Sequence, residues 1–146
     1  MKTSISQSHS HISNQKRELL SNALKFLEVR IKTIHTVTQW ATRMGYSRCY
    51  FSRHIHKIYG ETAISILHKT RLAAICEALY NQPSAKAFTV ARETGFKDDK
   101  SMGQFLSRNF HIVTADVRTR VGGDFDKLEM RKEEIYCYFT NRVTAG

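Results

Sequence analysis

The residues with the clearest chemistry form a basic and aromatic run, RCYFSRHIHKIY, at positions 48–59. Arginine can donate to both acceptors on the major-groove edge of a guanine, and arginine and lysine both neutralise phosphate. The run contains no Asp or Glu, and its cysteine is predicted to lie on a helix with no evident pocket or oxyanion hole. The run therefore indicates recognition of a nucleic acid, and we expect no enzymatic activity.

The overall charge points to the same kind of partner. The chain has 146 residues, with 23 Lys and Arg against 13 Asp and Glu, a net charge of +10 and a pI near 9.8. The first 122 residues carry 19 of the bases and 8 of the acids, so the excess lies there. Such a balance favours an anionic partner, either nucleic acid or an acidic membrane surface.

Signals for metals, cofactors and secretion are weak. The three cysteines form no CxxC pair, and the closely spaced histidine pairs lack further ligands nearby. The first residues have no apolar segment of signal-peptide length, and no run of about 18 apolar residues occurs. We expect no cofactor, no metal site and no membrane span, and we expect Cys76 to be a core residue.

Periodicity and capping residues divide the first half into helices. Apolar residues recur at intervals of three and four over 15–34, which predicts an amphipathic helix. The TVTQ segment at 36–39 fits a capping box before a short helix, and Gly45 suits the left-handed residue of a turn. Ser47 can then cap a helix over 48–59.

A longer helix is predicted after this motif. Thr62 can cap it, Ile64 and Arg71 share its inner stripe, and the segment around Pro83 ends it near Tyr80.

The pattern of the first half then occurs again. At an offset of 50 residues, Trp40-Ala41 and Gly45-Tyr46 match Val90-Ala91 and Gly95-Phe96. After one inserted residue the offset is 51, and the apolar positions of the two halves still match. They are Phe51, Ile55, Tyr59 and Ile66 in the first half and Met102, Leu106, Phe110 and Val117 in the second. The repeat predicts an all-α fold of two tandem helix-turn-helix subdomains joined by a long central helix. A plain helical bundle is the alternative.

The predicted division has five parts. These are a flexible tail over 1–14, a first subdomain over 15–61, the joining helix over 62–80, a second subdomain over 81–121 and an extension over 122–146. The extension fits a helix or a strand equally well. We expect it to dock on the protein's own core, with self-association or binding of a regulator or a polymerase subunit as alternatives.

From about residue 15 to residue 118 the chain resembles the paired helix-turn-helix domain of AraC/XylS-type bacterial transcription regulators. The matching residues are Ala41-x-x-x-Gly45-Tyr46-Ser47, Phe51-Ser52-Arg53, Gly60 and Arg71-Leu72-Ala73-Ala74 in the first half, and Ala91-x-x-x-Gly95-Phe96, Phe110 and Arg118 in the second. The resemblance implies a stand-alone regulator in the bacterial cytoplasm, at the nucleoid, with no small-molecule ligand. It also implies that the second helix of each motif enters a major groove.

The chain departs from the family pattern at three places, one of which is Val117, where an aromatic residue usually precedes the final arginine. The closing sequence of the second motif, Phe-Gly-x-Ser-Pro in the family, reads FHIVT at 110–114, and Ala63 stands where proline is common in the first half. These changes affect how helices begin and pack more than they affect base contacts.

By this resemblance Cys49, Ser52 and Arg53 contact bases from the first motif. Helical periodicity also places these positions on the face opposite Phe51 and Ile55. Arg53 is the strongest single candidate. Four neighbouring side chains are better suited to phosphates, namely Arg48, Tyr50, His56 and Lys57. A solvated basic helix face is the alternative.

By the same resemblance the groove-facing residues of the second motif are Asp99, Lys100, Ser101 and Gln104, with Arg108 at the DNA backbone. Gln104 can pair with adenine. The two acids at 98 and 99 favour the helix start but repel phosphate, and Gly103 lowers helix propensity by about 1 kcal/mol relative to alanine. We therefore expect the first motif to supply most of the affinity and sequence choice.

The joining helix, at about 1.5 Å per residue, is near 27 Å long, and adjacent grooves on one face of DNA lie about 34 Å apart. A monomer can therefore span two grooves of an asymmetric double-stranded site. The sequence predicts a sequence-specific transcription regulator, and the resemblance implies an activator that contacts RNA polymerase. The alternatives are an antagonist that keeps the fold and binds a regulator or RNA polymerase, and a sequence-neutral binder driven by charge.

Overall fold

The computed structural model describes residues 22–121, which form seven α-helices and no strands. In chain order they are α2 (Ala23–Val29), α3 (Val37–Met44), α4 (Arg48–Tyr59), α5 (Ala63–Asn81), α6 (Ala87–Glu93), α7 (Asp99–Phe110) and α8 (Thr114–Arg120). The predicted all-α fold class is confirmed. The predictions for the tail over 1–14 and the extension over 122–146 lie outside the described residues.

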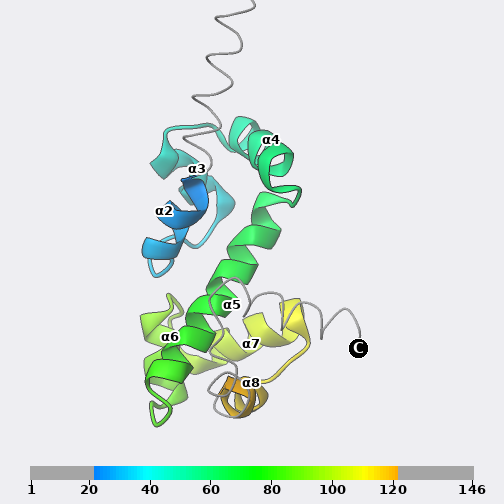
Figure 1. The fold of residues 1–146 in the computed structure, drawn as a ribbon. Helices are drawn as coiled ribbons and strands as arrows, with labels where there is room; N and C mark the ends of the chain where they lie inside the picture. Colours follow the sequence, from blue (N-terminus) through cyan, green and yellow to red (C-terminus); the bar gives the residue numbers. More distant parts are fainter. Residues whose placement is uncertain (1–21, 122–146) are drawn as a thin grey trace, which may run out of the picture.

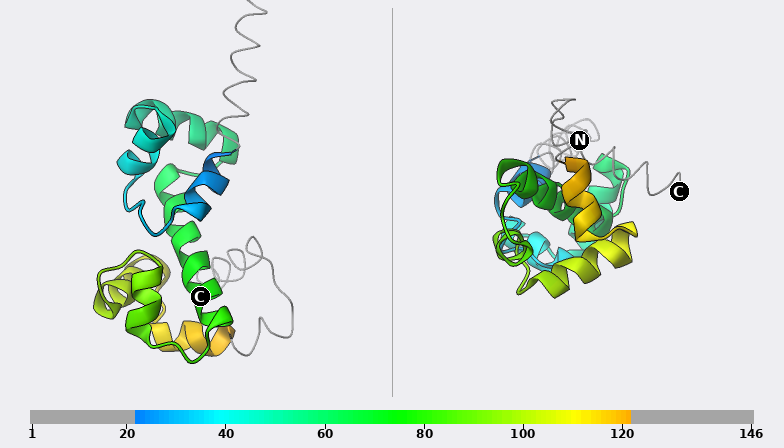
Figure 2. Two further views of the ribbon diagram at one scale, coloured as in Figure 1. Left: turned by 90° about the vertical axis from the view of Figure 1, so that its left-hand side faces the viewer. Right: turned by 90° about the horizontal axis from the view of Figure 1, so that it is seen from below.

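The helices form two groups at the two ends of α5 (Figure 1, Figure 2). Helices α2, α3 and α4 pack on one end of α5, and α6 and α8 pack on the other, with α7 packed against both of them. Each group encloses its own apolar core, and α5 contributes Ala63, Ile66 and Leu67 to the first and Leu72, Ile75 and Leu79 to the second. Two tandem helix-turn-helix units joined by one helix are therefore the observed architecture.

Trp40 is the centre of the first core. Its side chain is fully buried, and its ring meets that of Phe51 edge-on at a centroid distance of 4.9 Å. The indole Nε1 donates a hydrogen bond to the Ala23 carbonyl oxygen at 3.2 Å, which satisfies the polar end of the ring and ties α2 to α3. The contact between Trp40 of α3 and Phe51 of α4 therefore fixes the position of these two helices relative to each other.

The second core is built from the matching positions of the repeat. Val90, Met102, Leu106 and Val117 are all buried there. Arg118 closes this subdomain because its Nη1 donates to the Pro83 carbonyl oxygen at 2.7 Å, linking α8 to the loop that follows α5.

Local sequence signals set most helix boundaries, as predicted. The side chains of Thr36, Ser47 and Thr62 cap α3, α4 and α5, each accepting a hydrogen bond from the third residue of its helix. Gln39 also reaches back, although its oxygen accepts from the His35 amide rather than from the capping residue. Gly45 adopts the predicted left-handed conformation with φ of +89°.

Two expectations were wrong. The first helix ends at Val29 instead of reaching residue 34, and a turn at 30–33 carries the chain on to the buried Ile34. β-Branched side chains weaken helix propensity there, and the carbonyls of Ile31 and Ile34 accept hydrogen bonds from Arg71 instead. Ile64 is 46% exposed because α5 turns other faces toward the two cores.

Candidate nucleic-acid interface

The first motif presents its predicted base-facing residues away from the core. Phe51 and Ile55 are fully buried, whereas Cys49 and Arg53 are exposed on α4 and Ser52 is half-buried beside them. The cap at Ser47 and the left-handed Gly45 fix where α4 begins, so this face has a defined direction relative to α3.

The predicted phosphate-contacting residues flank that face. Arg48, His56 and Lys57 are exposed at the two ends of α4. Tyr50 is half-buried, and its ring stacks on Tyr46 at 5.3 Å and lies 4.2 Å from that of His54. Tyr50 is therefore held in an aromatic cluster, whereas the other three side chains extend into solvent.

The second motif has the same framework and a different surface. Asp98 caps α7 by accepting from the Ser101 amide at 2.8 Å, and this hydrogen bond is the main cause of a lowered pKa of the Asp98 carboxyl. Asp99, Lys100 and Gln104 are exposed, Ser101 is half-buried, and Arg108 is exposed near the end of the helix.

The two motifs differ in charge. Residues 48–59 hold two arginines, one lysine and no acid, whereas residues 98–110 hold one lysine and one arginine balanced by two aspartates. The positive charge is therefore concentrated on α4, and the greater share of the affinity assigned to the first motif stays a prediction.

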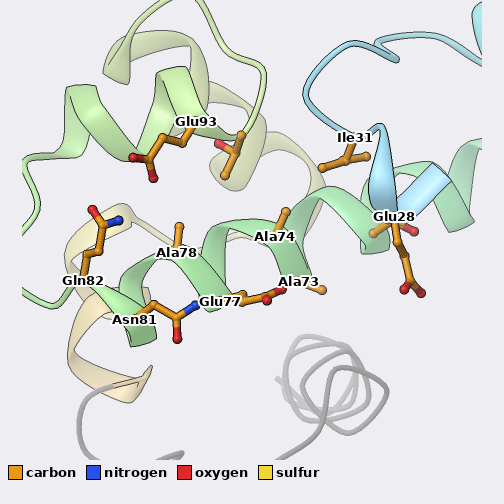
Figure 3. A pocket seen from close by; sticks show the side chains of 11 residues that line it. Glu28, Ile31, Ala73, Ala74, Glu77, Ala78, Asn81, Gln82 and Glu93 are labelled. Carbon is orange, nitrogen blue, oxygen red and sulfur yellow. The ribbon is translucent and has the colours of Figure 1, made fainter. Parts of the chain in front are cut away.

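A groove of about 320 Å³ lies along α5 between the two subdomains (Figure 3), and the sequence analysis did not predict it. Ala73, Ala74 and Ala78 of α5 line it, together with Glu28, Glu77 and Glu93. Its three carboxylates make the lining of the groove acidic, which disfavours phosphate within it. The alanines were the available signal, because small residues at spacings of one turn leave space beside a helix.

The cysteines differ sharply in environment. Cys76 is fully buried in the second core, as predicted, and burial raises the pKa of its thiol. Cys49 is exposed on α4. Within residues 22–121 no group of three or more His, Cys, Asp and Glu side chains is arranged to hold a metal ion.

Two helix-turn-helix units on one shared helix, each with its second helix outward, define a class of DNA-binding proteins. A family model described as a helix-turn-helix domain matches residues 40–120, and the chain belongs to this AraC-type family of DNA-binding transcription regulators. The suspected resemblance is thereby confirmed.

Solved structures show the same fold. The C-terminal domain of AraT, a response regulator from Geobacillus stearothermophilus, superposes with a TM-score of 0.60 at 18% identity, covering 69% of this chain and 84% of that one. An AraC-type transcriptional regulator from Chromobacterium violaceum gives 0.60 at 18%, covering 76% and 98%. A DNA-binding transcriptional dual regulator from Escherichia coli K-12 gives 0.56 at 10%, covering 71% and 92%.

Among curated protein sequences, none matches this chain. Of the helices in the described part of the chain, none is long and apolar enough to cross a membrane.

Proposed function

We propose that the protein binds an asymmetric double-stranded DNA site as a monomer, with α4 and α7 in successive major grooves. The observation that carries this proposal is the surface of α4, where Arg53 and Cys49 face outward on a capped helix that bears no acidic side chain. An arginine in this position can read a guanine by two hydrogen bonds.

The proposal assigns a different role to each motif. Cys49, Ser52 and Arg53 read bases in one groove, while Arg48, Tyr50, His56 and Lys57 bind the flanking phosphates. Asp99, Lys100, Ser101 and Gln104 meet the second groove, with Arg108 at its backbone. The division at 15–61, 62–80 and 81–121 is part of the same proposal.

The dimensions support the two-groove arrangement. The 19 residues of α5 extend over about 28 Å, against about 34 Å between adjacent grooves on one face of DNA. Because the two helices differ in sequence and charge, the two halves of the site differ as well, so the DNA sequence has no two-fold symmetry.

Selection from a random duplex library at two salt concentrations tests this function. We expect enrichment of one asymmetric site of about 15–20 base pairs, since two half-sites one helical turn apart span that length. Uniform binding that collapses with salt would instead identify a sequence-neutral binder. Absence of binding would favour the antagonist, which keeps the fold and sequesters a regulator or RNA polymerase.

We propose that the regulator acts in the bacterial cytoplasm, at the nucleoid, as an activator that contacts RNA polymerase. The family supports this direction of regulation, and no single residue carries it. In vitro transcription from a promoter placed beside the selected site measures it. Increased transcript yield supports activation, and decreased yield identifies a repressor.

A further inference from the structure

Arg71 lies where the two subdomains meet. It is 5% exposed, near the middle of α5, between the residues that α5 gives to the first core and those that it gives to the second. Its guanidinium lies 5.4 Å from the centre of the Phe96 ring, and burial lowers its pKa to about 10, so it remains cationic at neutral pH.

Three carbonyl oxygens accept hydrogen bonds from this guanidinium, and they come from both subdomains. Nη1 donates to Ile31 at 3.1 Å and to Thr94 at 2.6 Å, and Nη2 donates to Ile34. Ile31 and Ile34 belong to the turn after α2, and Thr94 ends α6. One side chain therefore joins the backbone of the first subdomain to that of the second.

Gly95 makes the close approach possible. A Cβ atom at this position would lie 2.6 Å from Arg71 Nη1 and 2.8 Å from the Lys32 carbonyl oxygen. The matching glycine of the first motif, Gly45, has a similar φ of +89° against +97°, yet nothing lies within 4 Å of its added Cβ. The close contact is thus a property of the second glycine alone.

Little else in the described part of the chain connects the subdomains directly. The helix pairs that pack extensively lie within one subdomain or include α5. On one side of α5 the alanine-lined groove takes the place of packed side chains. The contacts among Arg71, Thr94, Gly95 and the turn at 31–34, hereafter the Arg71 joint, therefore resist bending and rotation of one subdomain against the other.

We propose that the Arg71 joint fixes the distance and orientation between α4 and α7, and so makes the protein select DNA sites by the spacing of their two halves. This inference rests on the proposed two-groove binding. Inserting one base pair moves the second half-site by about 3.4 Å and rotates it by about 35°. A rigid joint cannot follow that change, whereas a loosened joint can.

Gly95→Ala tests the proposal, with Gly45→Ala as the matched control. Both variants place alanine in a left-handed turn, but only G95A pushes a methyl group into the joint. Arg71→Lys is a second test, because one ammonium nitrogen cannot reach across the same span of carbonyls as a planar guanidinium. Circular dichroism checks that each variant folds.

The first measurement needs no DNA. Spin labels on the exposed Cys49 of α4 and on a cysteine introduced at the exposed Ser107 of α7, with Cys137 replaced by serine, give a distance distribution by pulsed electron resonance. We expect one narrow distribution for the otherwise unaltered protein and for G45A, and a broadened or shifted one for G95A and R71K. Equal distributions in all four proteins would overturn the proposal.

The second measurement uses the selected duplex and the same duplex with one base pair inserted between its halves. We expect the unaltered protein and G45A to bind the longer duplex about tenfold more weakly, within the range that one mismatched base pair costs. For G95A and R71K the ratio of the affinity for the selected duplex to the affinity for the longer duplex should fall toward one. An unchanged ratio would count against the joint, whereas failure to select any duplex would count against the proposed function itself.

Discussion

Arg53 is the residue whose substitution is expected to change the DNA sequence preference of the protein most. We predict that Arg53→Ala weakens binding to the selected site by about 1 to 3 kcal/mol and removes the preference for one base at a single position. Its side chain is exposed on α4, so folding stability should not change by more than a few tenths of a kcal/mol. Site selection repeated with the variant measures the preference. An equal loss of affinity on every sequence would assign Arg53 to phosphate.

Lys57 provides the contrasting case on the same helix. We predict that Lys57→Ala weakens binding by the same factor on all duplexes and reduces the slope of log affinity against log salt by about one unit, as expected for loss of one phosphate contact. Titrations at several salt concentrations, on the selected and on a scrambled duplex, provide the slopes. A loss confined to the selected duplex would contradict this assignment.

His111 occupies a backbone position that suits glycine. Its φ is +55°, in the left-handed region, and it ends α7 where Gly60, with φ of +74°, ends α4. A side chain there costs about 1 to 2 kcal/mol, of which the greater freedom of unfolded glycine cancels part. We predict that His111→Gly stabilises the protein by about 0.5 to 1 kcal/mol.

Gly60→Ala is the matched control, because its added methyl group would meet nothing within 4 Å and only the backbone conformation opposes it. It should destabilise by about 1 kcal/mol. Urea unfolding measures both variants, and a destabilising H111G would show that the imidazole makes a stabilising contact.

At the scale of elements, the second copy of the motif lacks caps that the first copy has. Thr36 and Thr62 cap α3 and α5 through their side chains, whereas Lys86 and Val113, at the equivalent positions before α6 and α8, make no such hydrogen bond. The second helix of each motif is capped in both copies, by the side chain of Ser47 before α4 and by that of Asp98 before α7. The second subdomain therefore depends more on tertiary packing.

We predict that Val113→Thr stabilises the protein by about 1 kcal/mol by restoring a side-chain acceptor at the start of α8. The valine is 55% exposed, so little apolar burial is lost. The reverse change in the first copy, Thr62→Val, should destabilise by a similar amount. Urea unfolding compares the two. If both changes shift stability in the same direction, packing rather than capping governs these positions.

The helices were predictable where their signals are local. The start of α4 follows from Ser47 and its turn from Gly45, both of which act within four residues. The end of α2 was not predictable, because the carbonyls of Ile31 and Ile34 in the turn that follows it bond to Arg71, which is 40 residues away from Ile31. Helical periodicity correctly predicted that Cys49 and Arg53 of the candidate interface are exposed. The alanines of α5 indicate space beside that helix, but the Arg71 joint and the residues that close the groove from α2 and α6 depend on how the two subdomains meet, which no local pattern specifies.

At the scale of the whole molecule, stability should fall on mild acidification. His68 of α5 packs edge-on against Phe105 of α7 at 5.4 Å, and burial, followed by the charge of Arg71, lowers its pKa below 6.5. His35 has a lowered pKa for the same first cause. Below pH 6.5 these two histidines therefore bind more protons in the unfolded chain than in the folded protein. The free energy of unfolding consequently rises with pH through this range.

We predict a lower urea midpoint at about pH 5.5 than at about pH 7.5, and a smaller difference between the two in His68→Gln. His35 should maintain part of the difference in that variant. An identical pH dependence in the variant would show that His68 titrates alike in both states.

Because both cores include residues of α5, the position of these residues along the helix affects the order in which the two subdomains can fold during synthesis on the ribosome. Apart from the half-buried Ala74, the described residues of the first core end at Leu67, whereas those of the second extend from Leu72 to Val121. The amino-terminal half can therefore acquire its native packing while the carboxy-terminal half is still being translated. The nascent first half would then present α5 as a preformed surface on which the later helices assemble.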